Sequence, residues 1–577
     1  MTAGFSARFG ATGFSGALIL GLGILAALYL ISAPLGMLLV AAFRGPQDLL
    51  PLEPGTGWTL DNLASVYREP ALYATMIPNT AVFVAGAAGL GFAAAFVLAW
   101  LVERTDLPFG DAVFTVVLFP LLVPGVVVAI AWIYLLGPNA GWINLALRGA
   151  LGIAGEGPFN IFSMPGMILA QGAALVPFVF LLLSAALRSM NPELEEAASV
   201  AGAAPRCVFL AVTLPVLRPG VLAPLILATL VAFEQFEMPL IIGLPARISV
   251  FSTQIYYELN PDTNLPAYGR AAALALPFLV AGLGLLFAYN HLIRQSERFA
   301  TVTGRAYRPA TLRLGAWRWP AFAVVLLYVA LTVVLPLVVL VWTSLFGYRP
   351  PALSVLAQAN FAPYANLAAS TDFWLALRNT VLVAGASAAI VTLLGAILAW
   401  TVARTAMPGR AALDVVSFLS IGIPSVIAGL AALLLYLSLP LGIYGTVWVL
   451  VLAYSYRLAV ATRVARAALA QLGRELEDAA RIAGGGWLAT LRRVVLPLAL
   501  PSLVASFTLL FIIGFREFTL PVILQSRDNL VLSVILWNDF VSNKSADAAA
   551  VGTVILLCVA PLVFLGRRLL LHRAPRG

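Results

Sequence analysis

Five charged residues stand inside long apolar stretches of this 577-residue chain: Glu234, Glu237, Arg457, Arg516 and Glu517. Ionisable side chains are costly within a membrane and usually mark a functional site. Carboxylates and guanidinium groups in such places line ion or substrate paths, or pair with one another. We therefore expect these five residues to lie on a translocation path and its outer gate, or to form an ion pair that holds two parts of the chain in register.

Glu234 and Arg516 occupy equivalent positions of an internal repeat, and Gln235 matches Glu517. We expect the two repeats to face each other, so that Glu234 pairs with Arg516. Arg457 has no charged counterpart. Three interpretations remain open for it: it balances Glu234, Glu237 or Glu517, it meets an anionic substrate, or its side chain extends toward the cytoplasmic surface.

Groups that perform covalent chemistry are scarce in the sequence. It has two histidines and two cysteines, and it lacks the phosphate-binding pattern Gly-x-x-x-x-Gly-Lys-Ser/Thr. It also lacks a serine-elbow motif and any spacing typical of metal ligands. We therefore expect no catalytic residue, no certain metal site and no cofactor bound by this chain.

The composition is that of a membrane protein. Hydrophobic residues make up 62% and charged residues 10% of the chain, whereas soluble domains carry roughly 25% charged residues. A membrane-spanning helix needs about 20 apolar residues, and this rule predicts an all-α polytopic protein with 12 transmembrane helices. The predicted spans are 16–43, 74–102, 112–137, 163–188, 217–241, 269–293, 319–345, 378–402, 410–438, 443–465, 499–524 and 548–571.

The net charge of +9 comes mainly from arginines beside the apolar spans. Such clustering is typical of the cytoplasmic side of membrane proteins and does not indicate nucleic-acid binding. It places the segment between spans six and seven, and the C-terminus, in the cytoplasm. With an even number of spans, we expect both termini to be cytoplasmic.

The two halves of the chain repeat each other. Asn79-Thr80 returns as Asn379-Thr380, and Leu98-Ala99-Trp100 as Leu398-Ala399-Trp400. We predict a first half at 1–293, an arginine-rich linker at 294–318 and a second half at 319–577. With six spans each, the halves run in the same direction and form parallel repeats. Pro124 and Pro424 are expected to kink the third span of each half.

A second repeated feature is polar and lies between spans. Acid-Ala-Ala, three residues and Gly occur in the loop 193–215 and again in the loop 475–497, each followed by Leu-Pro. Alanine and glutamate favour a short helix, which the glycine ends. Counted from Glu196 to Asp478, the copies are 282 residues apart. The residues of interest are Glu195, Glu196, Ala197, Ala198, Gly202, Glu477, Asp478, Ala479, Ala480 and Gly484.

These doubled loops resemble the signature of binding-protein-dependent ABC importer membrane subunits; Asp478 stands where that family usually has Glu. The resemblance implies a fused, two-half permease of the type I ABC importer fold in a bacterial cytoplasmic membrane. It implies that both loops are coupling helices resting on a separate ABC ATPase homodimer, which binds ATP and Mg. A periplasmic substrate-binding protein is the other implied partner, and the external segments 44–73 and 346–377 are candidate platforms for it.

The substrate is suggested by a narrower resemblance. Phe-Glu-x-Phe-Glu-x-Pro at 233–239, followed by Leu-Ile-Ile-Gly-Leu-Pro, resembles ferric iron uptake permeases. Carboxylates also suit a hard cation. Permeases of the same build move phosphonates, sugar phosphates, thiamine or polyamines, so these remain alternatives. A secondary transporter driven by an ion gradient is the rival class, although it leaves the doubled cytoplasmic motif unexplained.

Overall fold

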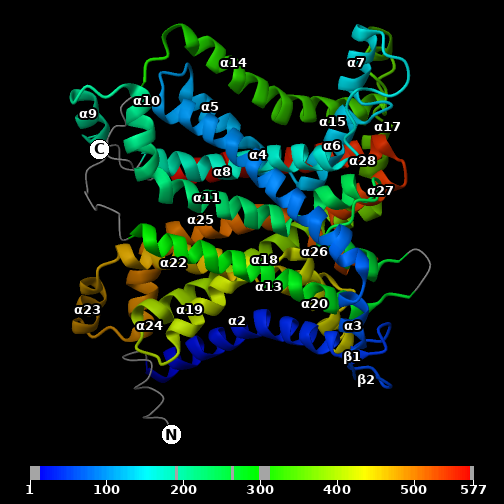
Figure 1. Cartoon of the computed structure of the whole chain (residues 1–577). Helices are drawn as coiled ribbons and strands as arrows, with labels where there is room; N and C mark the ends of the chain where they lie inside the picture. The colour runs from blue at the N-terminus through cyan, green and yellow to red at the C-terminus, as the bar shows by residue number, and fades with distance from the viewer. Residues whose placement is uncertain (1–12, 189–192, 262–264, 298–311, 572–577) are drawn as a thin grey trace.

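The computed structural model describes residues 13–188, 193–261, 265–297 and 312–571, and its regular structure is almost entirely helical (Figure 1). Helices predominate because backbone groups within lipid must be satisfied internally. Seven helices of the described residues are long and apolar enough to cross a membrane, or up to eleven if each of four bent pairs forms one span. The 27-residue helix α28 (Ser545–Leu571) matches the predicted twelfth span. The all-α polytopic fold is confirmed.

The first half contributes six spans. They are α2 (Gly13–Ala42), α4 (Ile77–Arg104), the bent pair α5 (Gly110–Val117) and α6 (Gly125–Leu136), α8 (Met164–Arg188), α11 (Leu214–Glu234) and α13 (Tyr268–Glu297). Shorter elements connect them: β1 (Arg44–Gly45), β2 (Gly57–Trp58), α3 (Asp61–Tyr67), α7 (Trp142–Leu151), α9 (Glu193–Val200), α10 (Pro205–Val208) and α12 (Phe251–Leu259).

The second half repeats this order. Its spans are α14 (Arg318–Val329) with α15 (Leu335–Phe346), α18 (Thr371–Arg404), α19 (Arg410–Leu419) with α20 (Ser425–Ser438), α21 (Val447–Tyr454) with α22 (Leu458–Gln471), α25 (Leu496–Phe515) and α28. The connecting elements are α16 (Leu353–Leu356), α17 (Ala362–Ala369), α23 (Arg474–Ile482), α24 (Trp487–Thr490), α26 (Thr519–Leu524) and α27 (Leu532–Val541).

The halves interlock through their first spans. Helix α2 of the first half packs against α20 and α18 of the second, and α15 of the second half packs against α6 of the first. In Figure 1, α2 and α14 accordingly run along opposite edges of the bundle. The sequence boundaries of the halves therefore do not coincide with the groups of helices that pack together.

Helix α13 continues to Glu297, into the segment 294–318 predicted as the linker. Residues 298–311 of the predicted linker lie outside the described residues. The chain resumes beside the end of α4, where Leu312 N donates to Arg104 O at 2.8 Å and Asp106 N donates to Leu312 O at 3.2 Å. The later part of the predicted linker is thus bound to the C-terminal end of α4.

The third spans break at the two prolines. The helix axes on either side of Pro124 differ by 101°, and those on either side of Pro424 by 108°. Each proline stands in extended backbone immediately before the second helix, a position that proline favours. The expected kinks are therefore breaks, which place the N-termini of α6 and α20 inside the bundle.

Candidate functional site

Two short helices of the signature loops, α9 and α23, lie at the same end of the molecule (Figure 1). We call them the signature helices. The glycines after them, Gly202 and Gly484, have φ values of +85° and +82°. Only glycine adopts this conformation without strain, and it ends a helix by satisfying its last carbonyls. The predicted helix and its glycine terminator are present in both copies.

Neighbouring acids of the signature helices point in opposite directions. Glu195 is 7% exposed and Glu477 is 5% exposed, whereas Glu196 and Asp478 are exposed. Ala197 and Ala479 are also exposed, and Ala198 and Ala480 are partly buried. The acid of the acid-Ala-Ala motif therefore lies on the free face, and the preceding glutamate faces the protein.

Each buried glutamate pairs with an arginine at the end of a long span. Glu195 accepts a hydrogen bond from Arg104 of α4, and Glu477 Oε1 lies 2.9 Å from Arg404 Nε of α18. Sequence analysis did not assign a role to either arginine. The sequence did contain a signal for these pairs, because Arg104 and Arg404 occupy equivalent positions of the repeat. Glu195 and Glu477 do so as well.

The free faces of the signature helices carry apolar side chains at matching positions. Leu194 and Leu476 are 51% and 48% exposed, and Val200 and Ile482 are 89% and 88% exposed. Large apolar side chains that are exposed together on one face mark a candidate surface for docking another protein. These four residues were also missed in the sequence, where they read as ordinary positions of an amphipathic helix.

All five intramembrane charged residues stand at breaks in their spans. Helix α11 ends at Glu234 and the chain continues extended at Gln235, so the predicted span 217–241 is interrupted. Helix α25 ends at Phe515, which places Arg516 and Glu517 before α26. Span ten bends by 51° around residues 455–457, where Arg457 precedes α22.

Arg457 pairs with Glu517, one of the three partners considered for it. Arg457 Nη2 lies 2.5 Å from Glu517 Oε2 and donates at 2.9 Å to Ser425 Oγ, in the first turn of α20. The side chains of the pair are 19% and 10% exposed. The pair therefore connects two helix breaks to the broken third span of the second half.

The predicted pairing of Glu234 with Arg516 is wrong. Arg516 instead crosses to the first half and donates to the backbone carbonyl of Leu121, just before the break at Pro124. Among the described residues, Glu234 Oε1 is buried without a hydrogen-bond partner. The guanidinium group that was expected to pair with Glu234 is thus bound to a backbone carbonyl of the first half.

Glu237 lies against the start of α6. A Cβ atom added to Gly125 would overlap its carboxylate, so the absence of a side chain at Gly125 makes room for Glu237. A carboxylate at a helix N-terminus is favoured by the helix dipole. The five charged residues thus gather around the broken third spans, with charges of both signs.

Asn79-Thr80 and Asn379-Thr380 hold the segments that follow these breaks. Thr80 Oγ1 accepts from Phe251 N at 3.2 Å, and Thr380 Oγ1 accepts from Leu532 N at 3.0 Å. Asn79 donates to the carbonyl of Ser249, and Asn379 donates to those of Asp528 and Leu530. The repeated dipeptides therefore satisfy backbone groups freed by the interrupted helices.

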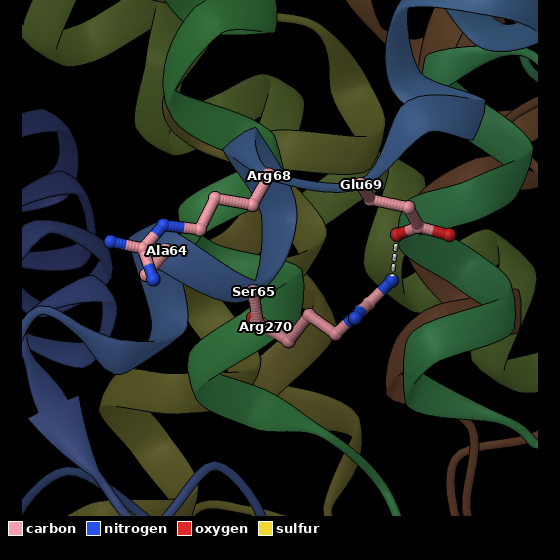
Figure 2. Close-up of a pocket in the computed structure, with 5 residues that line it drawn as sticks. All are labelled: Ala64, Ser65, Arg68, Glu69 and Arg270. Carbon is pink, nitrogen blue, oxygen red and sulfur yellow. Dashed lines mark hydrogen bonds and ion pairs between the residues drawn. The ribbon is translucent and has the colours of Figure 1, made fainter.

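A pocket of about 430 Å³ lies beside α3 (Figure 2), at the end of the molecule opposite the signature helices (Figure 1). Arg270, at the start of α13, pairs with Glu69 and lies 2.9 Å from Glu258. Ala64, Ser65 and Arg68 complete the lining. Four of its five lining residues fall within the predicted external platform 44–73, and the fifth, Arg270, belongs to α13.

No group of three or more His, Cys, Asp or Glu side chains is arranged to hold a metal ion in the part of the chain that the structure describes. At the breaks, the carboxylate of Glu517 is paired with the guanidinium group of Arg457.

Comparison with known protein families finds the same domain in both halves of the chain. The family model described as "Binding-protein-dependent transport system inner membrane component" matches residues 88–298 and 391–576. The ferric transport system permease protein FbpB of Actinobacillus pleuropneumoniae is 25% identical over 85% of this chain and 70% of that protein.

Two further relatives are informative. A putative ferric transport system permease of Haemophilus influenzae is 24% identical over 80% of this chain and 72% of that protein. The sulfate transport system permease protein CysW of Escherichia coli is 27% identical over 49% of this chain and 90% of that protein. The family match covers most of both halves. The chain therefore belongs to the binding-protein-dependent transport system inner membrane components, and it is an ABC importer permease that carries the family domain twice.

Proposed function

We propose that this permease imports ferric iron, which a periplasmic binding protein delivers. The single observation that carries the proposal is the similarity to ferric transport permeases over 85% and 80% of the chain, which spans both halves. The carboxylates of Glu234, Glu237 and Glu517 at the breaks support it, because hard cations take oxygen ligands. In this proposal they attract and pass the cation and do not store it.

Alternating access is the proposed mechanism. A separate ABC ATPase homodimer holds ATP and Mg, and this chain is not itself an enzyme. Closure of the ATPase dimer moves the signature helices, which act as coupling helices through Glu196, Asp478 and their exposed alanines. Gly202 and Gly484 keep the ends of these helices in a fixed conformation. The movement opens the path toward the binding protein and later toward the cytoplasm.

The path itself is proposed to close at the broken third spans. Arg457 and Glu517 form the second-half side of this gate, and Arg516 reaches from it to Leu121 of the first half. Opening the gate requires the Arg516 contact to part, because it joins the two halves. Glu234 and Glu237 are then available to a passing cation.

The proposed location is a bacterial cytoplasmic membrane, with both termini in the cytoplasm. Arginines beside spans six and twelve support this orientation. Both signature helices lie at one end of the bundle, as a common ATPase partner requires (Figure 1). The external pocket of Arg270 lies at the opposite end, where the binding protein would dock.

An anionic substrate is the second candidate. Arg457 and Arg516 belong to the same cluster, and the sulfate permease of Escherichia coli is among the relatives. An anion would be attracted by these guanidinium groups in place of the carboxylates. Organic phosphates and sulfate fall in this class.

Uptake by cells that express the chain with its ATPase and binding protein separates the two candidates. We expect radiolabelled ferric iron to accumulate and Glu237→Gln to reduce this accumulation. Asp414→Asn, at a partly exposed pair with Arg466 outside both the external pocket and the gate, serves as the matched carboxylate-to-amide control. Accumulation of sulfate or an organophosphate without iron would contradict the iron proposal and leave the permease fold unchanged.

A further inference from the structure

We propose that Arg104 and Arg404 are positioning residues that make α4 and α18 rigid struts between the signature helices and the gate. The inference rests on the coupling role proposed for α9 and α23, and it assigns the parts that carry their movement into the membrane. Each strut is fastened at its inner end by an arginine and at its outer end by an Asn-Thr pair.

The inner fastening of the first half is buried. Arg104 is 3% exposed and donates to Glu195 Oε2, while Thr213 Oγ1 donates to Glu195 Oε1 at 2.6 Å. Trp100 lies one turn earlier on α4 and packs edge-on against Phe209, with ring centroids 5.2 Å apart. Glu195 is therefore bound both by α4 and by the segment that follows the signature helix.

In the second half, the signature helix is also bound to the long span α18, but through a different set of contacts. Arg404 Nε lies 2.9 Å from Glu477 Oε1, and Arg404 Nη2 donates to the carbonyls of Leu469 and Leu472 at 2.9 Å and 2.7 Å. Trp400 and Trp487 meet edge-on at 6.4 Å. The arginine, the buried acid and an aromatic contact recur, whereas the position of Thr213 is Val495 in the second half.

Each strut reaches the gate at its outer end. Asn79 and Thr80 of α4 bind the segment after Glu237, and Asn379 and Thr380 of α18 bind the segment after Glu517. From Asn79 to Arg104, or from Asn379 to Arg404, an unbroken helix is about 38 Å long at 1.5 Å per residue. These struts contrast with the third spans, which break at proline.

The buried ion pair at the inner end of each strut is suited to transmitting a force from the signature helix to the long span. Removing one partner of a buried ion pair leaves an uncompensated charge, so the pair resists separation when the signature helix moves. Apolar packing alone would not hold α9 or α23, since Leu194, Val200, Leu476 and Ile482 point outward. A buried ion pair therefore links each signature helix to a long span.

Neutralising both pairs while keeping their volume tests the struts. The variant combines R104M and E195Q with R404M and E477Q, and it is reconstituted with the ATPase and binding-protein partners. The readout is the number of substrate molecules imported per ATP hydrolysed. We expect basal ATPase activity to remain and this ratio to fall by about 5- to 150-fold, the usual range of coupling between sites.

The Arg188 and Glu103 pair supplies the matched control. Arg188 Nε lies 2.6 Å from Glu103 Oε2 and joins the end of α8 to α4. R188M with E103Q should leave the import ratio unchanged. An unchanged ratio in the assembled four-residue variant would overturn the strut proposal.

Bulky substitutions at Gly202 and Gly484 separate this outcome from failure of the coupling role itself. If they also leave transport intact, the signature helices do not couple to an ATPase. If they abolish transport while the four-residue variant works normally, only the struts are contradicted.

If the four-residue variant does not assemble, the Arg404→Lys variant tests the strut proposal instead. Arg404→Lys retains a cation for Glu477 but cannot keep both carbonyl bonds of the guanidinium. Normal coupling in this variant supports an electrostatic fastening. Uncoupled ATP hydrolysis in an assembled Arg404→Lys complex would overturn the proposal, because the carbonyl bonds would then carry the link.

Discussion

Arg457 Nη2 lies 2.5 Å from Glu517 Oε2, and the two residues stand at separate helix breaks of the second half. Breaks in a membrane helix expose backbone groups and are tolerated where protein groups satisfy them. Ser533 Oγ donates to the carbonyl of Glu517 at 2.9 Å. The ion pair is therefore built on a backbone that its surroundings hold in place.

Removing the acid from this pair should destabilise the protein strongly. Glu517→Ala leaves the Arg457 guanidinium buried without its counter-ion, which costs about 3–5 kcal/mol. Thermal unfolding of the purified complex measures the loss. Asp414→Ala is the control, because Asp414 and Arg466 are 32% and 38% exposed, and exposed pairs contribute about 0–1 kcal/mol. Equal destabilisation by both substitutions would contradict the buried role of Arg457 and Glu517.

The place of Glu237 beside α6 should depend on Gly125. Gly125→Ala puts a methyl group where the carboxylate now lies, so Glu237 must move. We expect slower transport with the protein still inserted in the membrane, as measured by uptake and by the yield of purified complex. Gly89→Ala adds the same methyl group in open space on α4, and transport should be unchanged. Normal uptake by the Gly125→Ala variant would argue against a role for Glu237 at the gate.

The glycines that end the signature helices test the coupling surface. A built Cβ at Gly202 or Gly484 meets nothing within 4 Å, yet both residues have positive φ. Alanine there costs about 1–2 kcal/mol of local strain, whereas tryptophan adds bulk on the docking face. We expect both to insert normally, and Trp to abolish substrate-stimulated ATPase activity.

Gly152 is the matched control for that experiment. It follows α7, with φ +66° and open space around its Cβ position. Gly152→Trp carries the same backbone strain without touching the signature helices, so ATPase stimulation should persist. Equal loss of stimulation at Gly152 and Gly484 would mean that strain, and not a docking surface, explains the effect.

The hydroxyl oxygen of Thr380 should contribute to stability as a hydrogen-bond acceptor. Thr380→Val keeps the shape of the side chain but leaves the buried N–H of Leu532 without its partner, at a cost of about 1–3 kcal/mol. Thr553→Val removes only a hydroxyl that donates to Ala549 O within its own helix, so its effect should be smaller. Unfolding in increasing denaturant compares the two. A larger loss for Thr553→Val would contradict the bracing role of Thr380.

The sequence predicts the architecture well because membrane-spanning helices can be recognised from the length and hydropathy of their apolar segments. Spans such as 163–188 and 410–438 agree with the structure within a few residues. The signature helices also follow from local composition, since alanine, glutamate and a terminating glycine determine a short helix without distant contacts. The ferric substrate rests on resemblance and remains a proposal.

The pairings within the charged cluster at the helix breaks were predicted less well, because they depend on tertiary structure. The expected contact of Glu234 with Arg516 assumed unbroken fifth and eleventh spans related by symmetry. Both spans stop at these residues, and Arg516 takes the carbonyl of Leu121 instead. Arg104 and Arg404 were visible as repeated positions, but their partners lie about 90 and 70 residues away and only folding brings them together.

The most direct test of the account is ATPase activity of the chain reconstituted in lipid with its ATPase partner and titrated with binding protein. The account predicts strong stimulation by the iron-loaded binding protein, little by the iron-free form, and loss of stimulation in the Gly484→Trp variant. Stimulation only by a sulfate-loaded or organophosphate-loaded binding protein, or iron transport that continues without ATP under an ion gradient, would contradict it.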